Sequence, residues 1–224
     1  KINIKIIPKI ENFLDYQFRE NIKNIKIFNK KINFSFNKLK KTFQKSTILI
    51  TGAGGSIGSE LVKEILRLEP QNVLLIENSE FNLYKILDDL VYLKSEIKFK
   101  TRINYFLVSV TDIKKIKKIC IQYKPNYIFH CAAYKHVPLV EKNIIESVEN
   151  NYISTINLCE LALKLDISKL ILISSDKAVR PSSIMGATKR LSELAIKYFA
   201  LRSNIRKKKT SFSAVRFANV LNSS

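Results

Sequence analysis

The sequence predicts an α/β fold in which a doubly wound parallel sheet carries helices on both faces. Two observations support this prediction. Short apolar runs rich in β-branched residues alternate with longer segments of helical periodicity, and a glycine-rich turn follows the first run. Runs without polar alternation are typical of strands covered on both faces, and the segments between them are long enough for parallel crossovers.

The elements follow one another in regular order. Because crossovers between parallel strands are right-handed, the carboxyl ends of the strands are expected to form one ligand-binding edge. The predicted strands are 47–51, 72–76, 103–108, 127–130, 169–174 and 211–217, and the predicted helices lie near 57–68, 80–94, 112–122, 145–164 and 186–201.

The glycine-rich turn TGAGGSIGSEL (51–61) joins the first strand to the first helix. Gly52 permits a tight turn, Gly55 lets a pyrophosphate approach the backbone, and Gly58 lets the helix pack closely against the strand. The N–H groups and the dipole at the helix start favour phosphate. We therefore expect a bound dinucleotide whose contacts include Gly52, Gly55, Ser56, Ile57 and Gly58.

An acidic residue stands where a dinucleotide fold needs one. Glu77 ends the second strand, nineteen positions after Gly58, and can accept hydrogen bonds from the adenosine ribose. Its carboxylate would repel a 2′-phosphate, which favours NAD as the cofactor and leaves NADP as the alternative. A structural glycine turn followed by a surface Glu is the other interpretation.

These features divide the chain into two parts. Residues 47–224 are assigned to a Rossmann-like NAD(P)-binding domain. Residues 1–46 lack Gly and carry Lys throughout, and we assign them to a basic N-terminal extension or linker.

Polar residues that could move protons follow the fifth strand. In SSDKAVRPSSIMGATKR (174–190), Ser175, Asp176 and Lys177 stand at the strand end. Ser175 can hydrogen-bond a substrate hydroxyl, Asp176 can act as an acid if its pKa is raised, and Lys177 can act as a base if its pKa is lowered. The alternative is that Asp176 and Lys177 form a solvated ion pair of little energetic value.

The next helix carries Lys189, which can hold the nicotinamide ribose through its hydroxyl groups. Four residues earlier, where many nucleotide-cofactor enzymes of this pattern have a Tyr as acid/base, stands Met185. A thioether cannot transfer a proton, so Met185 is expected to fill apolar volume against the cofactor. Proton transfer would then depend on Asp176 and Lys177.

Six segments resemble, in order, the CapD-like polysaccharide biosynthesis proteins. These extended short-chain dehydrogenase/reductases act as nucleoside-diphosphate-sugar 4,6-dehydratases, typically on UDP-N-acetylglucosamine. The resemblance runs from about residue 46 to the end of the chain, and it implies a UDP-sugar substrate and a homo-oligomer. The segments are TGAGGSIG, FHCAAYKHVPLVE, NNYISTINL, SSDKAVRP, MGATKR and VRFANVL.

The stretch IENFLDYQF (10–18) looks like the linker that precedes the catalytic domain in larger, membrane-anchored members of the family. We therefore expect a fragment of such a protein, without the C-terminal substrate-binding part. The sequence has no apolar run of about 18 residues and no signal peptide. It predicts a cytoplasmic location, at the inner membrane's cytoplasmic face if a preceding part binds the membrane.

The resemblance also implies a reaction. Hydride leaves C4 of the sugar, the C5 proton is removed, water departs from C6, and the hydride returns to C6. The larger members likewise have Met in place of the Tyr and use a Thr-Asp-Lys triplet, whose Thr is replaced here by Ser175. Asp176 would protonate the departing C6 hydroxyl, and Lys177 would take the C5 proton.

Further site residues are implied by their positions in the family motifs. Ser109 stands where many relatives have an Asp near the adenine. The other implied cofactor contacts are Val110, Ala132 and Ala133, and the implied substrate contacts are Lys135, His136, Asn151 and Asn219.

Some positions have a plainer interpretation or depart from the family pattern. His136 could be an ordinary loop histidine, and His130 at a strand end is expected to be part of the core. Ser154 stands at a usual Gly position and is expected to tighten its helix. Ala218 and Asn222 also replace glycines of the family pattern.

The chain is strongly basic, with 39 Lys and Arg against 19 Asp and Glu and a net charge of +20. Such a charge suits nucleic acid, an anionic membrane surface or a nucleotide. The Lys residues are spread over predicted surface helices, and no nucleic-acid-binding motif accompanies the cluster RKKK at 206–209, so we expect no nucleic acid partner. The three Cys lack ligand spacing and predict no metal site.

Two alternatives to the dehydratase stay open. One is an epimerase of the same superfamily, against which Met185 and Asp176 argue. The other is a truncated, inactive NAD-binding module, which the replaced glycines support. The sequence leaves open the exact sugar nucleotide, the stereochemistry at C5 and the oligomeric state.

Overall fold

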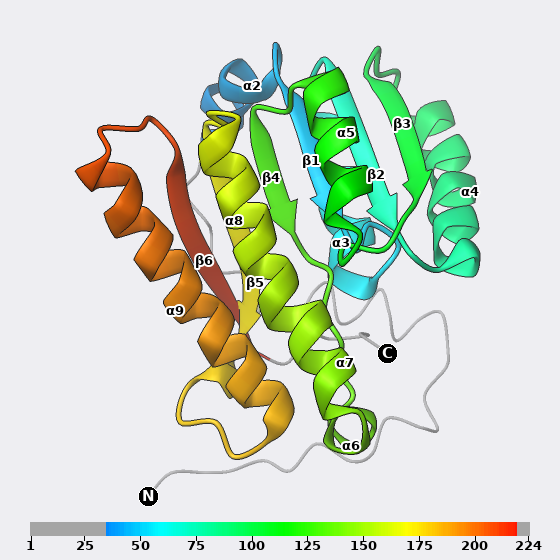
Figure 1. Cartoon of the computed structure of the whole chain (residues 1–224). Coiled ribbons are helices and arrows are strands. Elements are labelled where there is room, and N and C mark those ends of the chain that lie inside the picture. Colours follow the sequence, from blue (N-terminus) through cyan, green and yellow to red (C-terminus); the bar gives the residue numbers. More distant parts are fainter. Residues whose placement is uncertain (1–34, 219–224) are drawn as a thin grey trace, which may run out of the picture. The chain divides into compact units, whose positions relative to one another are not determined.

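The computed structural model describes residues 35–218, except the side chain of Glu96. Its strands form one parallel sheet in the order β3-β2-β1-β4-β5-β6 (Figure 1). The doubly wound parallel sheet is thus confirmed, and the strand order reverses between β1 and β4. The strands are β1 (Thr47–Thr51), β2 (Asn72–Glu77), β3 (Arg102–Leu107), β4 (Tyr127–His130), β5 (Lys169–Ser175) and β6 (Ser211–Phe217).

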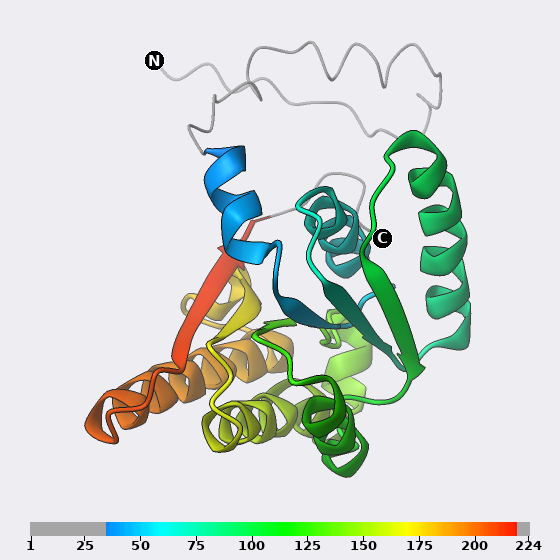
Figure 2. The same cartoon turned by 90° about the horizontal axis from the view of Figure 1, so that it is seen from above.

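Helices cover both faces of the sheet, as Figure 2 shows from above. Strand β1 explains why, because its successive side chains alternate between the faces. Ile48 and Ile50 belong to one apolar core and Leu49 to the other, and all three are fully buried. The first core contains α3 (Ser56–Arg67) and α4 (Glu80–Glu96), and the second contains α5 (Ile113–Tyr123), α8 (Ser154–Lys164) and α9 (Ile184–Ile205).

The compact unit that contains the sheet begins at Phe36. Helix α2 (Phe36–Phe43) lies within the predicted extension. Phe43 packs edge-on against Tyr127 of β4, with ring centroids 4.8 Å apart. The predicted domain starts at residue 47 because the strand pattern begins there. Helix α2 precedes that pattern and has no buried residue.

The predicted helix 145–164 is interrupted. It consists of α7 (Ile144–Val148), a π-helical turn (Glu149–Ile153) and α8. Ser154, expected to tighten the helix, follows the wider π turn, and its hydroxyl donates to the Asn150 carbonyl. A short helix that the sequence did not predict, α6 (Val137–Lys142), precedes α7.

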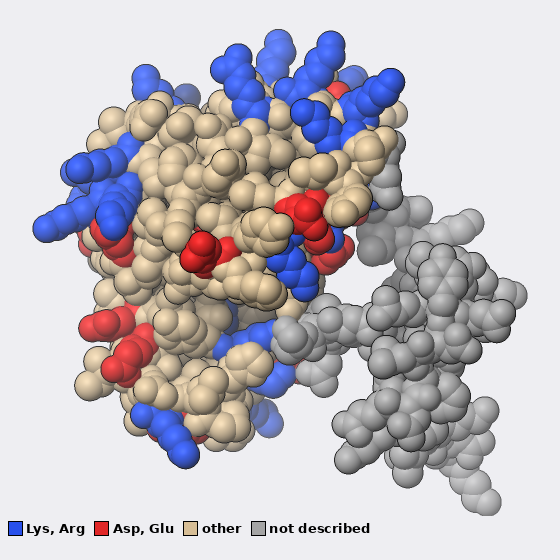
Figure 3. Space-filling view, turned by 90° about the vertical axis from the view of Figure 1, so that its right-hand side faces the viewer, with Lys and Arg blue, Asp and Glu red and all other residues tan. Residues whose placement is uncertain are grey.

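Basic side chains gather at the amino-terminal edge of the sheet on the face formed by α4 and β3 (Figure 3). Lys98, Lys100 and Arg102 lie there, at the start of β3, and are exposed. Figure 3 also shows Lys and Arg side chains at the left and in the lower half of this face, so positive charge is not confined to the amino-terminal edge. No helix within 35–218 is both long and apolar enough to cross a membrane.

His130, at the end of β4, is a core residue, as the sequence suggested. It is 1% exposed, and its Nδ1 and Nε2 lie 2.7 and 3.1 Å from the hydroxyls of Thr51 and Thr155. Burial, with the nearby charge of Lys189, lowers the pKa of His130 from 6.5 to about 3. The folded protein therefore holds this imidazole neutral.

The free energy of unfolding should depend on pH through His130. Above about pH 6.5 the residue is neutral in both states, but between 6.5 and about 3 only the unfolded chain binds the proton. The free energy of unfolding should then fall by about 1.4 kcal/mol per pH unit as the pH drops, from this residue alone. Urea titrations between about pH 5 and 7 measure the slope. His130→Gln should reduce this slope by about 1.4 kcal/mol per pH unit below about pH 6. Equal slopes in the two proteins would mean that His130 has the same pKa in the folded and unfolded states.

Candidate active site

A crevice of about 1390 Å³ lies at the carboxyl edge of the sheet, the lower end in Figure 1. Its wall combines the turn after β1, the ends of β2, β4 and β5, and the start of α9. The structure thus brings together segments that are far apart in the sequence. The predicted site residues that line the crevice are Gly52, Gly55, Ser56, Ile57, Gly58, Glu77, Val110, Ala132, Ala133, Lys135, His136, Ser175, Lys177 and Lys189.

The turn after β1 requires its glycines. Gly52 has a φ of +64°, which glycine adopts at little cost. A Cβ on Gly58 would lie 1.9 Å from the carbonyl oxygen of Gly52, so a side chain there would displace α3. A Cβ on Gly55 would meet only that same oxygen, at 3.3 Å, and Gly55 lines the crevice. No side chain caps α3 at Gly55, so its first turn can bind an anion.

Glu77 holds the glycine turn against β2. The side chain is buried, and its Oε2 accepts from the backbone N–H of Gly54 at 2.9 Å. Its Oε1 accepts from the N–H groups of Asn78 and Ser79 at 3.0 and 3.1 Å. A carboxylate can accept about four hydrogen bonds, so Glu77 can still accept one from a ribose hydroxyl.

A dinucleotide fits these residues. The turn leaves no room for a Cβ at Gly58, the start of α3 can bind phosphate, and an acidic acceptor stands at the end of β2. On the other wall, Lys135 Nζ lies 3.4 Å from the Ser56 hydroxyl. The loop after β4 therefore reaches across to the glycine turn.

The residues after β5 form a compact polar group. Ser175 Oγ donates to Asp176 Oδ1 at 2.9 Å, and Lys177 Nζ lies 3.5 Å from the same oxygen. Ser175 and Lys177 line the crevice, whereas Asp176 lies at its margin with an exposed side chain. Residues Asp176–Ala178 form a 3-10 turn, and Ser175 Oγ caps this turn by accepting from the Lys177 N–H.

The proposed acid is ionised in the free protein. The hydrogen bond from Ser175, aided by the positive charge of Lys177, holds the pKa of Asp176 below its usual value. Action as an acid requires a raised pKa of Asp176, and the free protein does not meet this condition. An exposed carboxylate with a hydroxyl donor and a cation beside it favours its charged form.

Lys189 is buried one helical turn after Met185. Its Nζ donates to the carbonyl oxygen of Ile173 at 3.0 Å, and it lines the crevice beside Met185. Burial lowers the pKa of Lys189 to about 8, although Cys131 and Glu193 favour the charged form. The Met185 side chain, 3% exposed, fills apolar space as expected.

Two implied contacts, Ser109 and Asn151, are not in the wall of the crevice. Ser109 turns its hydroxyl to Thr111 at 2.8 Å. Asn151 is 2% exposed and fully engaged by the protein: its amide bonds the backbone N–H and carbonyl of Tyr134 and the Thr188 hydroxyl. Its neighbour Asn150 lines the crevice instead. Asn219, like Asn222, lies outside the described residues.

Sequence reasoning missed residues that shape the site from behind. Gly186 allows α9 to approach the 3-10 turn, since a Cβ there would lie 2.5 Å from the Lys177 carbonyl oxygen. Glu141 of α6 accepts from the N–H of Ile184 at 2.7 Å and so caps α9. The glycine in MGATKR was a usable signal, but the Glu141 contact joins residues too far apart for the sequence to pair them.

Two glycine variants should separate folding from cofactor binding. Gly58→Ala should lower the free energy of unfolding by about 2 kcal/mol or more, because its Cβ meets the Gly52 carbonyl. Gly55→Ala should change it by less than about 1 kcal/mol, since its backbone conformation suits Ala. Calorimetric titration should nevertheless show at least about tenfold weaker NAD binding to Gly55→Ala, whose Cβ blocks the pyrophosphate. Unchanged NAD affinity would contradict this placement.

The sequence relatives include a polysaccharide biosynthesis protein and enzymes named for nucleotide-sugar substrates. The Staphylococcus aureus capsular polysaccharide biosynthesis protein CapD is 36% identical, covering 97% of this chain and 36% of that protein. A UDP-N-acetylglucosamine 4,6-dehydratase (inverting) from Campylobacter jejuni is 30% identical over 81% of this chain and 51% of its own. A Rickettsia bellii UDP-glucose 4-epimerase is 32% identical over 80% of this chain and 50% of its own length. The chain thus spans about a third to a half of these relatives' lengths.

Solved structures share the fold. Pen from Bacillus thuringiensis superposes with a TM-score of 0.72 and 28% identity, covering 81% of this chain and 54% of that one. The structure of MoeE5 in complex with UDP-glucose and NAD superposes with a TM-score of 0.59 and 21% identity, covering 76% of this chain and 54% of that one. The family model described as "Polysaccharide biosynthesis protein" matches residues 48–224. The chain therefore belongs to this family of polysaccharide biosynthesis proteins, within the extended short-chain dehydrogenase/reductases.

Proposed function

We propose that the protein is a nucleotide-sugar 4,6-dehydratase. It would convert a UDP-N-acetylhexosamine to a 4-keto-6-deoxy sugar with tightly bound NAD, for polysaccharide precursors. One observation carries the proposal: Ser175 and Lys177 enter the crevice beside Lys189, with Asp176 at its margin, while Met185 stands one turn before Lys189. Proton-transfer groups are thus supplied by the end of β5, because α9 supplies a thioether where related enzymes have a phenol.

The cofactor would lie across the crevice. The start of α3 and Gly55 would hold its pyrophosphate, Glu77 the adenosine ribose, and Lys189 the nicotinamide ribose. Bound NAD would supply the acceptor and then the donor of a hydride. The Glu77 carboxylate repels a 2′-phosphate, which supports NAD over NADP. The complex of MoeE5 with UDP-glucose and NAD is consistent with this pair of ligands.

The side chains after β5 would move the protons. The Lys177 amine would accept the proton from C5 of the sugar, and the Asp176 carboxyl would donate one to the departing C6 hydroxyl. Because Asp176 is ionised in the free protein, it must gain its proton once the sugar covers it and removes water. The Ser175 hydroxyl would exchange its bond to Asp176 for one to a sugar hydroxyl.

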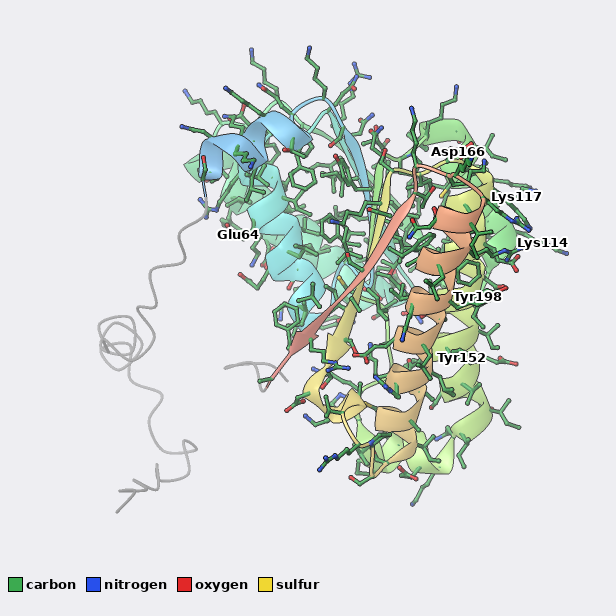
Figure 4. All side chains as sticks on the ribbon, turned by 90° about the vertical axis from the view of Figure 1, so that its left-hand side faces the viewer. Glu64, Lys114, Lys117, Tyr152, Asp166 and Tyr198 are labelled. Atoms are coloured by element: carbon green, nitrogen blue, oxygen red, sulfur yellow. The ribbon has the colours of Figure 1, made fainter. Side chains whose placement is uncertain are left out.

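Self-association is part of the proposal. The outer face of α9 exposes apolar side chains at helical spacing, among them Tyr198 (Figure 4), Leu201 and Ile205. Exposed apolar stripes of this kind often serve as contact surfaces. They support a homo-oligomer built through α9.

Likeness to UDP-glucose 4-epimerases makes epimerisation the second candidate. Its chemistry would return the hydride without loss of water. Met185 counts against it, because the residue cannot take the place of a proton-transferring phenol at that position.

Substitution of the proton-transfer groups should separate binding from turnover. Asp176→Asn and Lys177→Met should each lower the rate of 4-keto-6-deoxy sugar formation from UDP-N-acetylglucosamine about a hundredfold or more. NAD affinity should stay within about threefold of the parent, because neither group holds the cofactor. Mass spectrometry of the product and calorimetry with NAD give the two values.

The control is Lys117→Met, a matched substitution of an exposed lysine on α5 (Figure 4), which should change neither value. Formation of a C4 epimer would favour the second candidate. Binding of NAD with unchanged substrate would indicate an inactive module.

A further inference from the structure

A buried carboxylate ties together three elements beside the crevice. Glu193 of α9 is 9% exposed. Its Oε1 accepts from Ser174 Oγ at 2.8 Å and from Arg216 Nε at 2.7 Å, and its Oε2 accepts from Arg216 Nη2 at 2.7 Å. Arg190 Nη1 adds a longer contact, at 3.2 Å. Glu193 thus joins α9, β5 and β6 through one bidentate pair and one hydroxyl.

These contacts are in register with the candidate active site. Arg216 lies directly opposite Ser174 in the pairing of β5 with β6. Lys189, one turn before Glu193, donates to the carbonyl of Ile173, the preceding residue of β5. Two side chains of α9, one turn apart, therefore bind successive residues of β5. The next residue of each strand, Ser175 in β5 and its partner Phe217 in β6, lines the crevice.

The position of β6 depends on this pair more than that of an inner strand would. Within the described sheet β6 pairs only with β5, and its other side contacts no strand. Figure 4 shows β6 passing beside α9, whose Glu193 it meets through Arg216. A bidentate Arg–carboxylate pair fixes orientation as well as distance, and breaking one whose carboxylate is buried leaves an uncompensated charge.

We propose that Glu193 and Arg216 form a latch that positions Lys189, the turn Asp176–Ala178 and the end of β6 around the sugar nucleotide. Glu193 and Arg216 are positioning residues, because neither lines the crevice. This inference rests on the proposed function for the identity of the ligands. The latch itself is a property of the free protein.

The latch also sets the charge around Lys189. The groups that face this amine are the Ile173 carbonyl from β5, the neutral His130 at the end of β4, Cys131 directly after β4, and Glu193 from its own helix. Glu193 raises the pKa of Lys189 against the effect of burial. Loss of Glu193 should therefore lower that pKa, whereas loss of Arg216 removes the charge that compensates Glu193 and should raise it.

Hydrogen exchange of the free protein tests the latch without any ligand. Glu193→Gln and Arg216→Gln should each speed amide exchange in 211–217 and 175–178 by about tenfold or more. Arg216→Lys, which keeps the charge but loses the bidentate geometry, should show an intermediate increase. Glu160→Gln, which breaks an exposed pair with Lys164, is the control and should show none. Unchanged exchange in both Gln variants would overturn the latch.

The pH dependence of NAD affinity tests its positioning role. In the parent protein affinity should fall as the pH rises through about 8, where Lys189 loses its charge. The midpoint should move down by about half a unit or more in Glu193→Gln and up in Arg216→Gln. If the two substitutions only loosened the fold, the pH midpoints of both variants would move in the same direction or stay unchanged. Either result would overturn the proposal. If the parent does not bind NAD, the proposed function fails, and the exchange measurement still decides on the latch.

Discussion

The close approach of the chain to itself after β1 is the constraint on which the site depends. The backbone of Gly58 passes so near the Gly52 carbonyl that no side chain fits between them, and this starts α3 at the carboxyl end of β1. Glu77 then fastens the turn to β2 through the N–H of Gly54. The strand order reverses beside this turn, so the crevice opens where the helix start can meet an anion.

The opposite wall is built by a second set of polar contacts. Lys189 and Glu193, one turn apart on α9, hold β5 at Ile173 and Ser174. The strand therefore delivers its last residues into the crevice at a fixed position relative to the buried amine. The sheet thus presents the glycine turn on one side and a serine, a carboxylate and two amines on the other, an arrangement that suits the proposed chemistry on a sugar nucleotide.

The sequence was most informative where one physical requirement fixes the residue. Runs such as Ile48–Ile50 must be apolar on both faces, so the strands and their parallel arrangement could be predicted, and the turn at Gly58 admits only glycine. The sequence was less informative about the direction and the partners of individual side chains. Asn151 was placed near the site by its motif, but its amide is taken by Tyr134 and Thr188, which lie far along the chain. The ionised state of Asp176 likewise depends on how Ser175 folds back onto it.

The proposed reaction requires that the hydride leaves C4 and returns to C6 of the same bound sugar while the residues after β5 remove water. Incubation of the protein with UDP-N-acetylglucosamine carrying deuterium at C4 tests this most directly, with the label located by nuclear magnetic resonance. A dehydratase should give a 4-keto-6-deoxy product with the deuterium at C6. Recovery of deuterium at C4 of an epimerised or unchanged sugar would contradict it.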